Sequence, residues 1–242
     1  MQLELLGTIR ARSAGTQVDL GHARQRAVLA VLLLEPNEPH TADRLVERVW
    51  GDTGPRRPHT TLYGYLYRLR RALAAHHGPK IVRAEGGYRL DVDEQTVDLH
   101  RFRTLVRQAE ATDDAQAHLL LDQALRLWRA GAITGVDSPW LDQIRHALDL
   151  ERASAELRFN DISLRLGLHH VLLPRVSAQA ARDPLDEALA AQLMLTLYRC
   201  GRRTSALDHY RLVRRALADE LGLTPGPQLR GVHQQILTGR SI

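Results

Sequence analysis

The sequence predicts a mainly α-helical protein with small β-sheets, made of an N-terminal α+β domain and a C-terminal all-α domain. Apolar residues alternate in the manner of strands in two places, residues 1–20 and 81–90. Beyond Val92 they recur at helical spacing to the end of the chain. The charge divides at the same point: residues 1–92 hold 14 Lys and Arg against 9 Asp and Glu, and residues 93–242 hold 19 of each. We therefore expect two domains, residues 1–92 and residues 93–242.

The first half of the N-terminal domain predicts a sheet followed by two helices. Residues 1–20 alternate around a turn at 13–15, which indicates a small antiparallel sheet. A helix is expected from His22 to Leu34, and the turn residues at 36–39 end it. Thr41 is the expected N-cap of a second, short helix that closes at Trp50.

A third helix, expected from His59 to Ala75, carries two contrasting faces. Four leucines at i, i+4, i+7 and i+11 predict its buried face: Leu62, Leu66, Leu69 and Leu73. The opposite face is rich in arginine and tyrosine: Thr60, Tyr63, Gly64, Tyr67, Arg68, Arg70 and Arg71. These residue types can meet phosphates and base edges, so they suit a recognition helix in the major groove of DNA.

The segment Ile81 to Leu90 predicts a β-hairpin that turns at Gly86-Gly87. The order of a sheet, three helices and a hairpin describes a winged helix-turn-helix domain. Between Arg56 and Arg89 eight basic residues stand against Glu85 alone. Such a local excess is expected of a protein that binds a polyanion, although charge alone would fit a solvated basic face equally well.

The C-terminal part predicts a tetratricopeptide-like helical repeat. Gly167 and Gly201 lie 34 residues apart, which is the period of that repeat, and each follows one helix and precedes another. Two earlier helices, around residues 101–110 and 115–129, predict another hairpin, but residues 131–139 break its register. A last amphipathic helix, containing Leu229 and Ile236, is the expected cap.

Several classes of protein and site are excluded or disfavoured. Cys200 is the sole cysteine, so neither an intrachain disulfide nor a multi-cysteine metal site is possible. Lys80 is the sole lysine and lies outside any Gly-Lys-Ser/Thr sequence, which excludes a P-loop ATPase. The sequence contains no catalytic motif, and its histidine pairs lack partners at metal spacing. We expect no enzyme activity, no cofactor and no metal.

The location expected from the sequence is the cytoplasm. The longest apolar run, Ala27 to Leu34, is too short to cross a bilayer, which needs roughly 20 residues. The first ten residues contain Glu4 where a signal peptide would be apolar.

Several motifs resemble known bacterial regulators. The first part resembles the output domain of response regulators, of the OmpR/PhoB type, through Leu45–Gly51, Arg68–Leu73 and Gly86–Leu90. The second part resembles the bacterial transcriptional activator domain, through segments 124–129, 192–202, 206–210 and 220–227. The combination is similar to the Streptomyces antibiotic regulatory proteins (SARPs), in particular to the small members without a nucleotide-binding domain.

The resemblance implies an activator of a secondary-metabolite gene cluster. Members bind direct repeats near a promoter as a side-by-side dimer and recruit RNA polymerase, and contact with the sigma subunit is made chiefly by the DNA-binding domain. Direct repeats require a head-to-tail pair with sites about one helical turn apart. The protein would then be associated with the nucleoid. The alternative from another class is a helical-repeat scaffold whose basic domain binds RNA or an acidic protein partner.

The resemblance also implies a set of DNA-binding residues. It assigns the recognition face to Thr60, Tyr63, Gly64, Tyr67, Arg68 and Arg70, a backbone contact to Trp50, and a wing position near phosphate to Tyr88. We add Arg57 and Arg71 from charge and helical phase, and Arg83 as the arginine of the wing.

Three features depart from the family's usual pattern. Tyr63, Gly64 and Tyr67 replace the residue types that are common there, so base preference cannot be carried over. Arg83 lies further from the Gly-Tyr pair than is usual, and Glu85 at the wing tip would repel phosphate. A glycine inside a helix costs about 1 kcal/mol relative to alanine, so we hypothesise that Gly64 lets the helix backbone approach DNA closely. The alternative is a neutral substitution.

Overall fold

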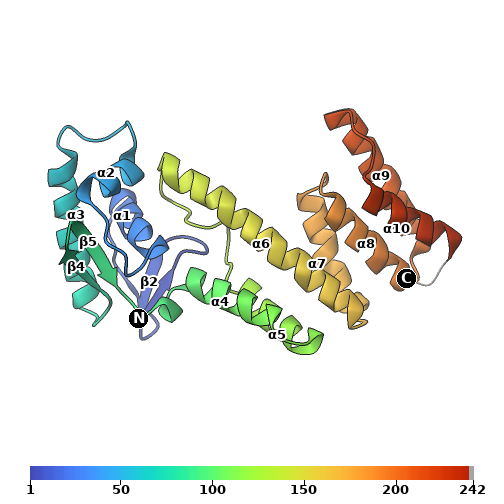
Figure 1. Cartoon of the computed structure of the whole chain (residues 1–242), viewed down its shortest axis with the longest axis horizontal. Helices are drawn as coiled ribbons and strands as arrows, with labels where there is room; N and C mark the ends of the chain where they lie inside the picture. The colour runs from blue at the N-terminus through green and yellow to red at the C-terminus, as the bar shows by residue number, and fades with distance from the viewer. Residues whose placement is uncertain (240–242) are drawn as a thin grey trace. The chain divides into compact units, whose positions relative to one another are not determined.

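The computed structural model describes residues 1–239 and divides them into two compact units (Figure 1). Unit 1 comprises Met1–Glu110 and Asp122–Ala153, and unit 2 comprises Ala111–Leu121 and the residues from Ser154 on. The mainly helical composition with small sheets confirms the predicted fold class. None of the described helices is long and apolar enough to cross a membrane.

Unit 1 begins with the expected three-stranded antiparallel sheet of β1 (Gln2–Glu4), β2 (Arg10–Ser13) and β3 (Thr16–Val18), in that order. Leu3 pairs with Ala11, and Ala11 pairs with Val18, so one face of the sheet is apolar and buried. The sheet is fastened to the later part of unit 1 by Asp98, whose carboxylate accepts the backbone N–H groups of Leu5 and Leu6 at 2.7 and 3.2 Å. Burial raises the pKa of Asp98.

Three helices follow where the sequence predicts them: α1 (Ala23–Leu34), α2 (Ala42–Trp50) and α3 (Pro58–Ala74). Thr41 is the N-cap of α2, because its Oγ1 accepts the N–H of Arg44 at 3.1 Å. α1 is the central helix, with residues 27–33 fully buried. All four leucines of the predicted α3 stripe are at most 1% exposed, so the opposite face of α3 is available to a ligand.

The wing consists of β4 (Lys80–Ala84) and β5 (Gly87–Asp91). The turn lies at Glu85-Gly86, one residue before the predicted Gly86-Gly87, because Gly87 is already part of β5. The backbone groups of Tyr88 and His40 form two mutual hydrogen bonds of 2.8 Å. The backbone at His40 is thus a third segment that pairs with the hairpin. Gly87 permits this contact, since a Cβ there would lie 1.8 Å from the carbonyl oxygen of His40.

Residues 93–239 contain no further β-strand, as the sequence predicts. The 3-10 helix η1 (Glu94–Thr96) and the helix α4 (Asp98–Glu110) belong to unit 1. α5 (Asp114–Leu125) is shorter than predicted, and α6 (Pro139–Arg165) starts after the irregular segment 131–138. Both helices have residues in each unit.

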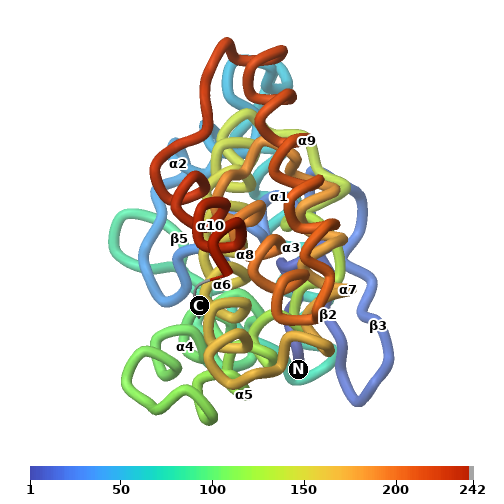
Figure 2. Tube along the Cα trace, turned by 90° about the vertical axis from the view of Figure 1, so that its right-hand side faces the viewer, coloured from blue at the N-terminus to red at the C-terminus, as the bar shows by residue number. Residues whose placement is uncertain are grey.

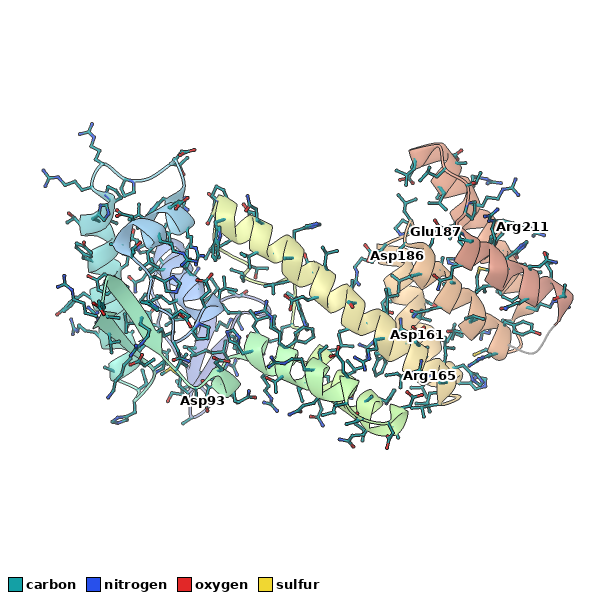
Figure 3. All side chains as sticks on the ribbon, in the orientation of Figure 1. Asp93, Asp161, Arg165, Asp186, Glu187 and Arg211 are labelled. Carbon is teal, nitrogen blue, oxygen red and sulfur yellow. The ribbon has the colours of Figure 1, made fainter. Side chains whose placement is uncertain are left out.

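Unit 2 continues with α7 (His169–Arg182), α8 (Glu187–Arg199), α9 (Arg203–Leu221) and the cap α10 (Pro227–Thr238). The predicted turns are present, with Gly167 and Gly201 at φ of +75° and +76°, a conformation that favours glycine. α10 packs beside α8 and α9 (Figure 2). Asp186 caps α8, and the neighbouring Glu187 accepts the N–H of Gly226 at 2.5 Å, which fixes the start of α10 (Figure 3).

Candidate nucleic-acid interface

The exposed side of α3 carries one continuous stripe, which we call the outer stripe: Thr60, Gly64, Tyr67 and Arg71. These residues have the same i, i+4, i+7, i+11 spacing as the buried leucines and lie opposite to them. The Tyr67 side chain is 59% exposed. A large, rigid aromatic ring in water is typical of a binding surface, because it offers contact area at a low cost in conformational entropy.

A second group lies where α3 meets the wing. Arg70 donates from Nε to the carbonyl oxygen of Ile81 at 2.7 Å, and its guanidinium lies 5.3 Å from the ring centre of Tyr88. The ring of Tyr63, which is 47% exposed, lies 6.1 Å from that of Tyr88. Three of the predicted site residues, Tyr63, Arg70 and Tyr88, are therefore brought together, and Arg70 is directed toward the wing.

The other flank of α3 faces α1. Arg68 donates from Nε to Oε1 of Gln25 at 2.9 Å, and its guanidinium lies 5.2 Å from the ring centre of Tyr65. Tyr65 in turn stacks on Trp50 at 5.9 Å. Trp50 is 4% exposed and so offers little surface of its own to a ligand. Gln25 and Tyr65 were not predicted from the sequence as parts of this group. Gln25, a polar residue among the apolar positions of α1, is the signal that could have indicated it.

The outlying arginines of the predicted site are also exposed. Arg57 immediately precedes α3, and its carbonyl oxygen accepts the Oγ1 hydrogen of Thr61 at 3.0 Å. Arg83 lies on β4, paired across the hairpin with Tyr88.

The positive charge of this surface is largely unneutralised. Within residues 1–239, no ion pair involves Arg57, Arg68, Arg71 or Arg83. Arg89 is different: it bonds to Asp91 at 2.5 Å, which lowers the pKa of that carboxyl, so the two charges cancel. Guanidinium groups that are not in ion pairs can bind phosphates, and the exposed aromatic rings beside them can contact bases.

The wing is supported by a small cluster around the partly exposed Glu35. Arg48 donates to both carboxylate oxygens of Glu35 at 2.8 Å, and this bond lowers the pKa of Glu35. His40 is fully buried and its ring lies 3.7 Å from the same carboxylate. Burial lowers the pKa of His40, which favours the neutral ring at pH 7. The segment that holds Tyr88 is thus anchored to α2.

The described part of the chain contains no group of three His, Cys, Asp or Glu residues that could hold a metal ion.

Two family models match successive parts of the chain. The model of the transcriptional regulatory protein C terminal domain matches residues 15–90. That of the bacterial transcriptional activator domain matches residues 97–237. Regulatory protein DnrI of Streptomyces peucetius is 34% identical over 250 residues, which cover 98% of this chain and 92% of DnrI. The chain belongs to the SARP family. Its N-terminal part therefore matches a domain of transcriptional regulatory proteins and its C-terminal part a transcriptional activator domain, as the motifs predicted.

Other relatives of this SARP are longer. Regulatory protein AfsR of Streptomyces griseus is 34% identical over 241 residues, and the chain spans about a quarter of it: 98% of this chain and 24% of AfsR. A solved structure of EmbR of Mycobacterium tuberculosis, in complex with a low affinity phosphopeptide, has a TM-score of 0.91 and 30% identity. The match covers 100% of this chain and 66% of that one. The likeness supports the winged-helix and helical-repeat architecture.

Proposed function

We propose that this SARP binds promoter DNA in a sequence-specific manner through α3 and activates a secondary-metabolite gene cluster. The observation that carries the proposal is the outer stripe, which is flanked on both sides by arginines. In it Tyr67 is exposed, and Arg71 makes no ion pair within residues 1–239. An α-helix with such a face fits the major groove, which is about 12 Å wide. The names of DnrI and AfsR, both regulatory proteins of Streptomyces, support the antibiotic context.

In this proposal the groups of residues around α3 contact different parts of the DNA. Thr60, Gly64, Tyr67 and Arg71 face the base edges, where the groove carries a readable pattern of donors and acceptors. Tyr63, Arg70 and Tyr88 contact the adjacent backbone from the wing side, and Arg57 and Arg83 bind further phosphates. Trp50 supports Tyr65 from beneath and reaches the duplex at most through its small exposed edge.

The proposed assembly on DNA is the one that the family's direct-repeat sites require. Two protomers bind direct repeats side by side, on one face of the duplex, with sites about one helical turn apart. The complex then recruits RNA polymerase through a contact between the DNA-binding domain, residues 1–92, and the sigma subunit. The proposal needs no cofactor, and it locates the protein in the cytoplasm on the nucleoid.

A gel-shift titration tests DNA binding directly. The purified chain is titrated onto promoter fragments across a range of salt concentrations, with RNA as competitor. We expect a discrete complex that RNA displaces poorly, and a salt dependence that becomes shallower by about 1 in log–log slope when a phosphate-binding arginine is removed. Equal competition by RNA would favour the scaffold alternative.

A reconstituted transcription assay tests activation separately. RNA polymerase holoenzyme, the bound promoter and the protein are combined, and run-off transcripts are counted with and without the protein. The proposal requires more transcript with the protein present. DNA binding without any increase would restrict the role to DNA binding.

A further inference from the structure

An open depression of about 670 Å³ lies beside the outer stripe, between the start of α1 and the C-terminal half of α3. Its lining includes Asp19, Gly21, His22, Gln25, Arg68 and Arg71. Two arginines and one aspartate are thus among the residues that line it. The carboxylate of Asp19 is partly engaged, because its Oδ1 accepts the N–H of Gly21 at 2.8 Å.

Gln25 is a buried amide with both ends bonded. It is 3% exposed, its Nε2 donates to the carbonyl oxygen of Leu20 at 3.0 Å, and its Oε1 accepts from Nε of Arg68 at 2.9 Å. Gly21 leaves room for this arrangement, since a Cβ at that position would lie 2.7 Å from Nε2 of Gln25. The orientation of the amide is therefore fixed from both sides.

This amide fixes the guanidinium of Arg68 in turn. One edge bonds to Gln25, and the group lies over the ring of Tyr65. Within residues 1–239, the two terminal amino groups make no hydrogen bond or ion pair. They can donate in parallel to two oxygens of one phosphate, which is the strongest way for arginine to bind an anion.

We propose that Gln25 is a positioning residue, which holds Arg68 as the ligand of a DNA backbone phosphate in this depression. The inference rests on the proposed DNA-binding function. A phosphate is the expected ligand because Arg68 lies on the flank of α3 toward α1, off the outer stripe that faces the bases. Fixing the side chain before binding removes the entropy cost of ordering it on the DNA.

A double-mutant cycle on the full chain tests this proposal. Gln25→Leu removes the acceptor at similar volume, and Arg68→Ala removes the guanidinium. We expect each single variant to weaken promoter binding about fivefold and to reduce the salt slope by up to about 1. The double variant should bind no more weakly than Arg68→Ala alone, because the amide acts only through the arginine.

A matched cycle with Arg83→Ala separates positioning from a general folding defect. Arg83 is on the wing, paired with Tyr88, whereas the Gln25 amide bonds to Leu20 and Arg68, so the effects of Gln25→Leu and Arg83→Ala on affinity should multiply. If Gln25→Leu acted through a folding defect, its loss of affinity would multiply with that of Arg68→Ala and with that of Arg83→Ala alike. Wild-type affinity in Gln25→Leu, or multiplication in the Arg68 cycle, would overturn the inference while leaving DNA binding intact. If the wild-type chain does not bind the promoter at all, the proposed function fails instead.

Discussion

At the scale of the residue, Gly64 is a position where the requirements of folding and of DNA binding can be tested separately. A Cβ added there would meet only Nη2 of Arg68, at 3.8 Å, which is an ordinary contact. The fold thus has room for alanine, and its own packing gives no reason to keep a glycine inside α3. The hypothesis that Gly64 lets the α3 backbone approach DNA closely can therefore be tested by substitution with alanine.

Gly64→Ala should stabilise the protein by about 0.5–1 kcal/mol, because alanine favours the helix, and should weaken DNA binding, because its methyl group separates the backbone from the groove. Thermal unfolding and promoter binding measure the two effects. Gly231→Ala is the matched control, since Gly231 lies inside α10 with no atom near its absent Cβ. It should raise stability and leave affinity unchanged. Unchanged affinity in Gly64→Ala would refute close approach and support a neutral substitution.

Glu85 is the one acidic residue in the basic segment between Arg56 and Arg89, and it is exposed at the turn of the wing. Glu85→Gln should therefore bind promoter DNA several-fold more tightly at low salt. The gain in binding free energy is on the order of 1 kcal/mol or less, because the charge is exposed, and it should shrink as the salt concentration rises. Anisotropy titrations at two salt concentrations measure this. The control Asp219→Asn removes an exposed charge from α9. Equal affinity of Glu85→Gln and the wild type at low salt would place the wing tip away from phosphate.

At the scale of the element, the sequence predicted the helices and strands well because their signals are local. The leucine stripe of α3 and the cap at Thr41 are contained within a few residues. The side-chain partners could not be predicted in the same way. The bond between Gln25 and Arg68 joins residues 43 apart, and the pairing of His40 with Tyr88 depends on how the wing folds back. Nothing in the local pattern fixes such contacts.

The wing depends on that distant pairing, so Gly87→Ala should detach it. The new Cβ would collide with the backbone of His40, and relieving the collision breaks two hydrogen bonds. We expect a loss of about 2–3 kcal/mol in the free energy of unfolding, together with weaker DNA binding. Urea unfolding measures the loss. Gly131→Ala is the control, since its Cβ would be 3.8 Å from its nearest neighbour. If Gly87→Ala is as stable as this control, the wing is not fixed in the way described.

At the scale of the whole molecule, three histidines should make stability depend on pH. Burial lowers the pKa of His40, His209 and His233 in the folded chain. As pH falls from 7 to 5.5, the unfolded chain takes up protons that the folded chain resists, so the free energy of unfolding decreases. Each histidine can contribute at most about 1.4 kcal/mol per pH unit. Asp98, with its raised pKa, acts in the opposite direction at lower pH.

Thermal unfolding at pH 7 and pH 5.5 measures this dependence. We expect a lower midpoint at pH 5.5, and a smaller difference between the two pH values in His209→Leu, which removes one of the three groups. A midpoint that is equal or higher at pH 5.5 in the wild type would contradict the lowered pKa values of these histidines.

The proposed function requires two copies of this SARP to read direct repeats through α3. Footprinting of genomic fragments bound by the purified chain tests it most directly. We expect two protected segments of the same sequence and orientation, about one helical turn apart, and loss of both in Arg71→Ala. Protection of an inverted repeat, or protection without any shared sequence, would contradict it.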